Sequence, residues 1–114
     1  MKRALLSVPD LFFAPRIADV LKRLGYTMAE VDPAETAFDG VGLLVVQLEG
    51  ARDQWLNLIE RAHYAHVPVL AFGRHTDAVA LRAARQAGAT RAVPNSQLMA
   101  ELPQLIEQLG TEQP

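Results

Sequence analysis

The sequence contains no cysteine, which excludes disulfide bonds, thiolate metal sites and thiol nucleophiles. It has no basic excess either, because 11 Lys and Arg side chains face 13 Asp and Glu side chains, and this balance argues against a nucleic-acid partner. No run approaches the roughly 20 apolar residues that cross a bilayer, so we expect no membrane partner. The apolar start is interrupted by Pro9 and Asp10, which favours a first strand over a signal peptide. The lack of cysteine fits a cytoplasmic location.

Half of the residues are hydrophobic and 21% are charged, a composition typical of soluble globular domains. The length of 114 residues suits one domain. We expect this domain to cover residues 1–110 and residues 111–114 to form a disordered tail.

Five short apolar runs predict β-strands. They cover residues 4–8, 27–31, 42–48, 67–72 and 91–93. The runs 43–46 and 67–72 are apolar nearly throughout, as expected for strands of a parallel sheet that helices cover on both faces.

Between these runs, apolar side chains recur at helical spacing. The three stripes consist of Phe13, Ile17, Val20, Leu21 and Leu24, of Trp55, Leu58, Ile59 and Ala62, and of Leu98, Leu102, Leu105, Ile106 and Leu109. A fourth, alanine-rich helix is predicted over residues 77–87.

Glycine and proline mark the expected helix ends. Gly25, Gly88 and Gly110 each follow a helical stretch, where a left-handed cap favours a residue without a Cβ atom. Pro103 removes a backbone donor inside the last helix, so we expect a separate turn near Ser96 or a bend near Glu101.

The alternation of strands and helices predicts an α/β fold with a flavodoxin-like, doubly wound, five-stranded parallel sheet in the order 2-1-3-4-5. The connection between the second and third strands, residues 32–41, is short for a crossover helix. We therefore expect that helix to be short or absent.

Two stretches resemble the receiver domains of bacterial response regulators, the CheY-like family. Residues 4–26 are similar to the family's opening of apolar strand, acidic loop, helix and Gly-Tyr pair, here Gly25 and Tyr26. Residues 68–89, PVLAFGRHTDAVALRAARQAGA, are similar to its fourth strand and helix, including the Ala-Gly-Ala at 87–89. The resemblance implies a bacterial signal-transduction domain.

The positions that carry the family's phosphoryl chemistry differ in this sequence. The resemblance puts the two cation-binding acids at Val8 and Pro9 and the phosphoacceptor aspartate at Gln47. It puts the family's Thr or Ser at Gly73, its lysine at Asn95 and its switch aromatic at Ala92. Phosphoryl transfer needs a cation and an oxygen nucleophile, which these residues do not supply. The resemblance therefore implies a pseudo-receiver with no catalytic residues, no metal and no cofactor.

Polar residues collect where the strands end, the edge at which open parallel sheets bind ligands. The ligand-binding candidates are Asp10, Gln47, Gly73, Arg74, His75, Asp77 and Asn95, with Pro9, Glu49 and Ser96 beside them. In the segment 72–77 the glycine would let backbone amides approach an anion, and Arg74 and His75 would pair with it. The alternative is that Thr76 or Asp77 only caps the next helix.

Other histidines and acids give weaker signals. Asp10, His75 and Asp77 are too few to establish a metal site, and none is predicted. His63 and His66 are expected at the opposite edge, before the fourth strand, as surface residues.

The arginines indicate a partner surface. Arg82 and Arg85 are expected to project from the alanine-rich helix, with Arg91 on the adjoining fifth strand. Such a surface suits an acidic patch on another protein, or Glu101 and Glu107 of a second copy in a homodimer. The alternative is a solvated helix face.

We therefore expect a non-enzymatic, phosphorylation-independent, receiver-like signalling domain that acts through protein–protein contacts. The alternative function is a small-ligand or anion sensor that uses the strand ends around residues 73–77.

Overall fold

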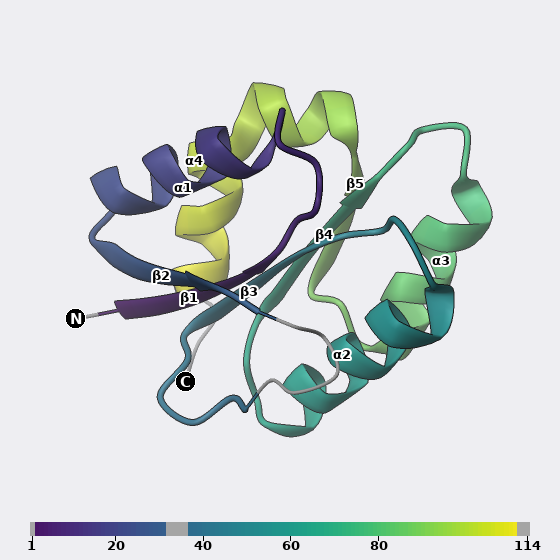
Figure 1. Ribbon diagram of the computed structural model, residues 1–114, viewed down its shortest axis with the longest axis horizontal. Helices are drawn as coiled ribbons and strands as arrows, with labels where there is room; N and C mark the ends of the chain where they lie inside the picture. The colour runs from purple at the N-terminus through teal and green to yellow at the C-terminus, as the bar shows by residue number, and fades with distance from the viewer. Residues whose placement is uncertain (1, 32–36, 112–114) are drawn as a thin grey trace.

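Five parallel strands form the middle layer of the structure, a computed structural model that describes residues 2–31 and 37–111 (Figure 1). The strands are β1 (Lys2–Ser7), β2 (Tyr26–Glu30), β3 (Leu43–Gln47), β4 (Val69–Gly73) and β5 (Arg91–Pro94). Their order in the sheet is β2-β1-β3-β4-β5, which confirms the predicted topology. β3 and β4 are buried at every position, as their unbroken apolar sequences predict.

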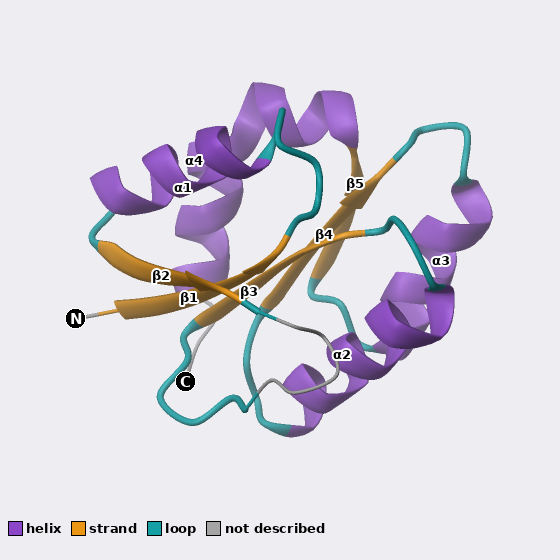
Figure 2. Cartoon of the chain, viewed as in Figure 1, coloured by secondary structure: helices purple, strands orange, loops and turns teal. Residues whose placement is uncertain are grey.

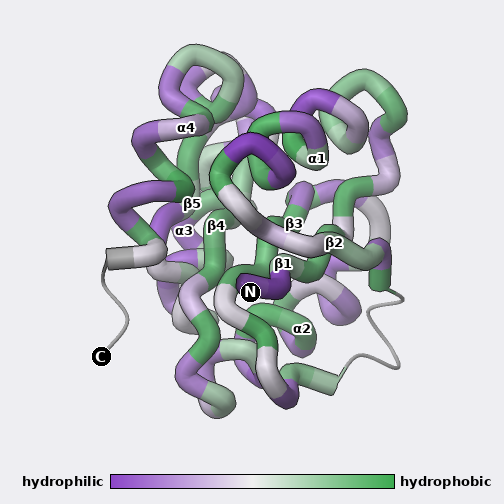
Figure 3. Tube along the Cα trace, turned by 90° about the vertical axis from the view of Figure 1, so that its left-hand side faces the viewer, coloured by the Kyte–Doolittle hydropathy of each residue, from purple (hydrophilic) through white to green (hydrophobic). Residues whose placement is uncertain are grey.

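Helices cover both faces of the sheet (Figure 2). The helices α1 (Ala14–Arg23) and α4 (Asn95–Thr111) pack on one face, and α2 (Arg52–Tyr64) and α3 (Ala78–Ala87) pack on the other. The side chains of β3 alternate between the two cores, because Leu43 and Val45 face α1 and α4, whereas Leu44 and Val46 face α2 and α3. Along the helices the chain alternates between hydrophobic and hydrophilic residues, as amphipathic packing requires (Figure 3).

Two of the three predicted glycine caps are confirmed. Gly25 and Gly88 have φ values of +88° and +117° and follow α1 and α3. The prediction for Gly110 is wrong, since α4 runs through it to Thr111, the first residue of the predicted disordered tail. Burial of Ile106 and Leu109 holds the last turn against the sheet and outweighs the weak helix propensity of glycine.

The last helix is bent where the sequence indicates. Glu101, two residues before Pro103, has φ −123° and ψ 18° and separates two helical segments. The proline ring and its missing N–H account for this break.

The connection from β2 to β3 has no helix in its described part, residues 37–42. Residues 32–36 of the predicted connection and residues 112–114 of the predicted tail lie outside the described residues.

Tyr26 is the first residue of β2, and its side chain is buried. This burial raises the pKa of the Tyr26 phenol above its ordinary value.

Candidate functional site

The predicted ligand-binding residues lie where β1, β3, β4 and β5 end. Four of the seven make side-chain bonds: Asp10 and Asp77 within their own loops, and Gln47 and Arg74 to a neighbouring loop. Gln47, the last residue of β3, is only 4% exposed. Its Oε1 atom accepts a hydrogen bond from the backbone N–H of Asp10, at 3.1 Å. Asp10 Oδ1 in turn accepts a hydrogen bond from the N–H of Phe12, at 2.8 Å. Gln47 therefore braces the loop between β1 and α1.

The loop after β4 uses its polar side chains in the same way. Asp77 is the N-cap of α3, and its Oδ1 accepts a hydrogen bond from Ala80 N at 3.0 Å. This bond confirms the capping role considered for Asp77. Arg74 Nε lies 3.2 Å from Glu49 Oε1 and forms an ion pair with it, while His75 is exposed.

Gly73 and Asn95 serve packing and helix initiation. Gly73 is buried at the end of β4, and a Cβ atom there would lie 3.3 Å from the Leu48 Cβ atom. This glycine therefore makes room for a neighbouring side chain, which is a structural reason for its presence. Asn95 begins α4, and its Oδ1 atom is buried without a hydrogen-bond partner among the described residues, whereas the next residue, Ser96, is exposed.

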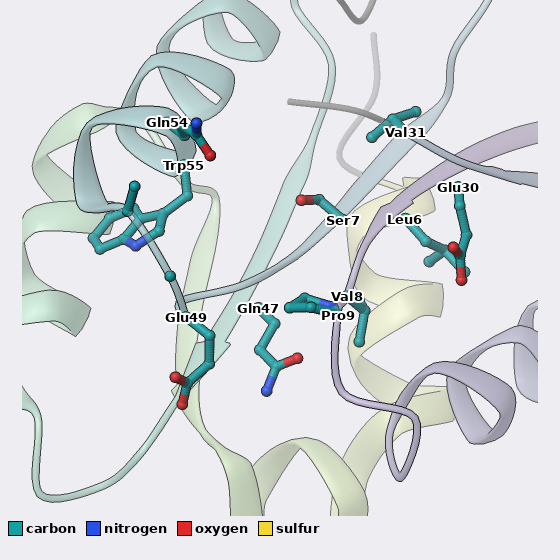
Figure 4. A pocket seen from close by; sticks show the side chains of 12 residues that line it. Leu6, Ser7, Val8, Pro9, Glu30, Val31, Gln47, Glu49, Gln54 and Trp55 are labelled. Carbon is teal, nitrogen blue, oxygen red and sulfur yellow. The ribbon is translucent and has the colours of Figure 1, made fainter. Parts of the chain in front are cut away.

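A cavity of about 310 Å³ lies at this edge of the sheet, but most of the predicted ligand residues do not line it (Figure 4). Of the predicted ligand-binding candidates it includes Gln47, together with the neighbouring Pro9 and Glu49. The rest of the lining comes from the ends of β1 and β2 and the start of α2: Leu6, Ser7, Val8, Glu30, Val31, Gly50, Ala51, Gln54 and Trp55.

The cavity is suited to neutral or cationic groups rather than to anions. Glu30 and Glu49 lie on either side of Pro9 in Figure 4, and no lysine or arginine is among the lining residues. The Glu30 carboxylate repels an anion, whereas the charge of Glu49 is offset by its ion pair with Arg74 outside the lining. The sequence prediction missed Ser7 and Glu30, although both stand at the carboxyl ends of strands, the place where the rule for open sheets directs attention.

No group of three or more His, Asp or Glu side chains within residues 2–31 and 37–111 is arranged to hold a metal ion. In the same part of the chain, no helix combines the length and apolar character that crossing a membrane requires.

The predicted partner surface contains one freely exposed arginine and two that bond within the chain. Arg82 is exposed on α3. Arg85 Nη2 donates a hydrogen bond to the carbonyl of Ala92 in the edge strand β5, at 2.8 Å. Arg91 Nη1 donates to Gln108 Oε1 of α4, at 3.2 Å. Arg85 is exposed, as expected for a residue that projects from the helix, but its guanidinium also bonds to the edge strand.

Comparisons with known proteins identify the fold. No protein-family model and no curated protein sequence matches the chain. Among solved structures, a CheY-like protein (tadZ) from Pseudomonas aeruginosa PAO1 superposes with a TM-score of 0.81 at 21% identity, over 96% of this chain and 100% of that one. The receiver domain of NtrX from Brucella abortus gives 0.78 at 17% identity, over 97% and 99% of the two chains.

A response regulator from Thermotoga maritima gives a TM-score of 0.77 at 12% identity, over 98% of this chain and 99% of that one. The chain therefore has the CheY-like flavodoxin fold, and its structural neighbours are receiver domains of response regulators.

Proposed function

We propose that this protein is a cytoplasmic, receiver-like signalling domain that works through protein–protein contacts and without phosphorylation. The observation that carries the proposal is the position of Gln47. In the register of the receiver resemblance it replaces the phosphoacceptor, and its buried amide braces Asp10. An amide is a poor nucleophile toward a phosphoryl donor, and Val8 and Pro9 offer no carboxylate to a cation.

Contacts to a partner are proposed for the surface formed by α3, β5 and α4. Arg85 and Arg91 each use one donor within the chain, and a guanidinium has five, so both retain donors for a carboxylate. Their internal bonds limit rotamer freedom and so reduce the entropy lost on binding. Arg82 adds an exposed charge on the same helix. We therefore propose a second copy as partner, with Glu101 and Glu107 of its α4 as counter-charges.

Sedimentation velocity over a range of concentrations tests this surface. Wild type should self-associate, and Arg82→Glu should weaken the association, with Arg82→Gln as the milder control. The melting temperature should stay within about two degrees, because exposed substitutions rarely change stability by more than roughly 0.5 kcal/mol. Arg85→Glu is less clean, since it also removes the bond to Ala92. Equal association of wild type and Arg82→Glu would contradict the proposed surface.

Phosphorylation independence has a separate test. Intact mass spectrometry after incubation with acetyl phosphate and magnesium should show no addition of a phosphoryl group. Magnesium alone should leave the melting temperature unchanged, because a ligand stabilises a protein only by binding its native state. A base-labile phosphoryl adduct would refute this part of the proposal.

The alternative function, an anion sensor around residues 73–77, has less support. Arg74 is already paired with Glu49, and Asp77 caps α3. Glu49 offsets the positive charge of Arg74, and Asp77 is itself negative, so the loop offers an anion little net positive charge.

A further inference from the structure

A second hollow lies at the opposite edge of the sheet, where the chain leaves α2 for β4 and α3 for β5. Its volume is about 410 Å³. We call it the α2–α3 hollow. It is lined by Glu60, His63, Tyr64, His66, Gln86 and Ala87. α2 and α3 pack side by side on one face of the sheet, so their two carboxyl ends meet here (Figure 1).

The lining of the α2–α3 hollow carries negative charge. The ends of α2, at Tyr64, and of α3, at Ala87, each carry the partial negative charge of a helix carboxyl terminus. Glu60 adds a carboxylate that makes no ion pair with any described residue. No lysine or arginine lines the hollow. Arg61 and Arg85, in the last turns of α2 and α3, and Arg82, one turn before Gln86, all lie outside the lining. A positive charge is the complement of this set.

An aromatic side chain stands at the same place. Tyr64 is 82% exposed, although large aromatic side chains are normally buried for most of their area. Its ring meets the ring of His63 edge-on, at a centroid distance of 6.3 Å. An exposed tyrosine face attracts guanidinium and ammonium groups through its quadrupole.

The backbone at His66 sets the end of α2 apart from the ends of α1 and α3. A left-handed residue follows each of these three helices: Gly25 after α1, His66 after α2 and Gly88 after α3. His66 has φ +60°, which is unfavourable for a residue with a Cβ atom, and histidine tolerates it better than most residues. His66 is the one of these three left-handed residues that has a side chain, and it lines the hollow.

The contact between Gly88, after α3, and His63 of α2 leaves no room for a side chain at Gly88. A Cβ atom on Gly88 would lie 2.6 Å from His63 Cγ and 2.7 Å from His63 Cβ. Gly88 is therefore required by the position of His63, and the two helix ends are fitted to each other around the hollow.

We infer that the α2–α3 hollow binds a cationic group, a guanidinium or an ammonium, with Glu60 as counter-charge and Tyr64 as aromatic platform. The cation comes either from an arginine or lysine side chain of another protein or from a small free amine. This site is separate from the surface proposed above, which presents positive charge.

The inference is tested by NMR titration of the ¹⁵N-labelled protein with two probes, agmatine and an acetylated, amidated Gly-Arg-Gly peptide. Saturable shifts are expected at residues 60–66 and 86–88. Glu60→Gln and Tyr64→Ala should each weaken binding about two- to fivefold, the effect of losing one exposed ion pair or cation–π contact. Glu101→Gln, which removes an exposed acid on α4, and Tyr64→Phe should change it little. Tighter binding of the peptide than of agmatine would identify a protein side chain as the ligand. Binding of agmatine at least as tight as that of the peptide would identify a free amine.

A second variant separates structure from binding. His66→Gly should keep or raise the melting temperature, because glycine adopts the left-handed conformation freely, and should weaken binding of both probes. Arg82→Glu should leave or strengthen probe binding, although it is expected to disrupt self-association, so the two proposals fail independently. The inference is overturned if neither probe gives a saturable shift, or if Glu60→Gln and Tyr64→Ala bind both probes as wild type does.

Discussion

The two edges of the sheet use their polar side chains differently. At the carboxyl edge, where open α/β sheets usually bind ligands, Gln47 bonds to Asp10, Asp77 to α3 and Arg74 to Glu49. At the amino edge, Glu60 makes no ion pair with any described residue and Tyr64 is largely exposed. Three of the polar side chains at the carboxyl edge are thus bonded within the chain, although Asn95 Oδ1 has no partner among the described residues, whereas Glu60 and Tyr64 at the amino edge stay exposed.

This contrast separates fold from site. The order of the parallel sheet indicates the edge at which open α/β folds usually bind ligands, but the side chains at that edge decide what it does. Here they stabilise loops. The change in the free energy of unfolding on substitution at each edge measures how much the polar side chains there contribute to stability.

The largest effect is expected at the amino edge for Gly88→Ala. The added Cβ atom would meet His63 Cγ at 2.6 Å and would also force an unfavourable φ of +117°. Strain and overpacking together predict a loss of about 2–4 kcal/mol in the free energy of unfolding, measured by urea denaturation. Because the His63 Cβ atom is fixed by the backbone of α2, a change of rotamer cannot relieve the contact.

Gly25→Ala is the matched control. Gly25 has φ +88°, and a Cβ atom there would have nothing within 4 Å. Only the conformational cost of about 1–2 kcal/mol remains. Equal losses for the two variants would show that α2 and α3 move apart easily, and would contradict a preformed hollow.

The carboxyl edge is tested by Gln47→Leu, which removes the acceptor for the Asp10 N–H while keeping a similar volume. An unsatisfied, partly buried donor predicts a loss of about 1–2 kcal/mol in the free energy of unfolding. Amide NMR shifts should change at residues 10–12, the turn that Gln47 supports. Gln54→Leu, which replaces an exposed amide at the same cavity, should stay within about 0.5 kcal/mol of wild type. Unchanged amide shifts at Asp10 would show that the loop between β1 and α1 keeps its conformation without the bond to Gln47.

The sequence predicts the fold well because the signals for the strands are local. The apolar runs of β3 and β4 identify a doubly covered sheet, and Pro103 predicts the bend at Glu101. The Gln47–Asp10 bond joins residues 37 positions apart, so no local pattern reveals it. The failed cap at Gly110 has the same origin, since burial of Leu109 against the sheet is a tertiary effect.

The candidate sites are less accessible to sequence reasoning than the strands. The carboxyl-edge rule leads to Gln47 and Glu49, yet the cavity also depends on Trp55 and Gln54 in the first turn of α2. The sequence places His63 and His66 at the edge of the α2–α3 hollow as surface residues, but it does not predict a hollow there. His66 follows α2 where glycines follow α1 and α3, and its left-handed conformation is visible only in the structure.

The smallest effect is expected for Asp77→Ala, which tests whether the loop after β4 is committed to capping. Loss of the Asp77 Oδ1 bond to Ala80 N should lower the free energy of unfolding by about 1 kcal/mol, the usual contribution of an N-cap. Asp77→Asn keeps an acceptor and should retain most of the stability, while Thr76→Ala, at the neighbouring exposed position, should cost less than about 0.5 kcal/mol. A free carboxylate held in place for a ligand predicts the reverse, because its removal would leave stability unchanged or improved. The sign of the change in urea denaturation therefore decides whether Asp77 serves the helix or an unfilled site.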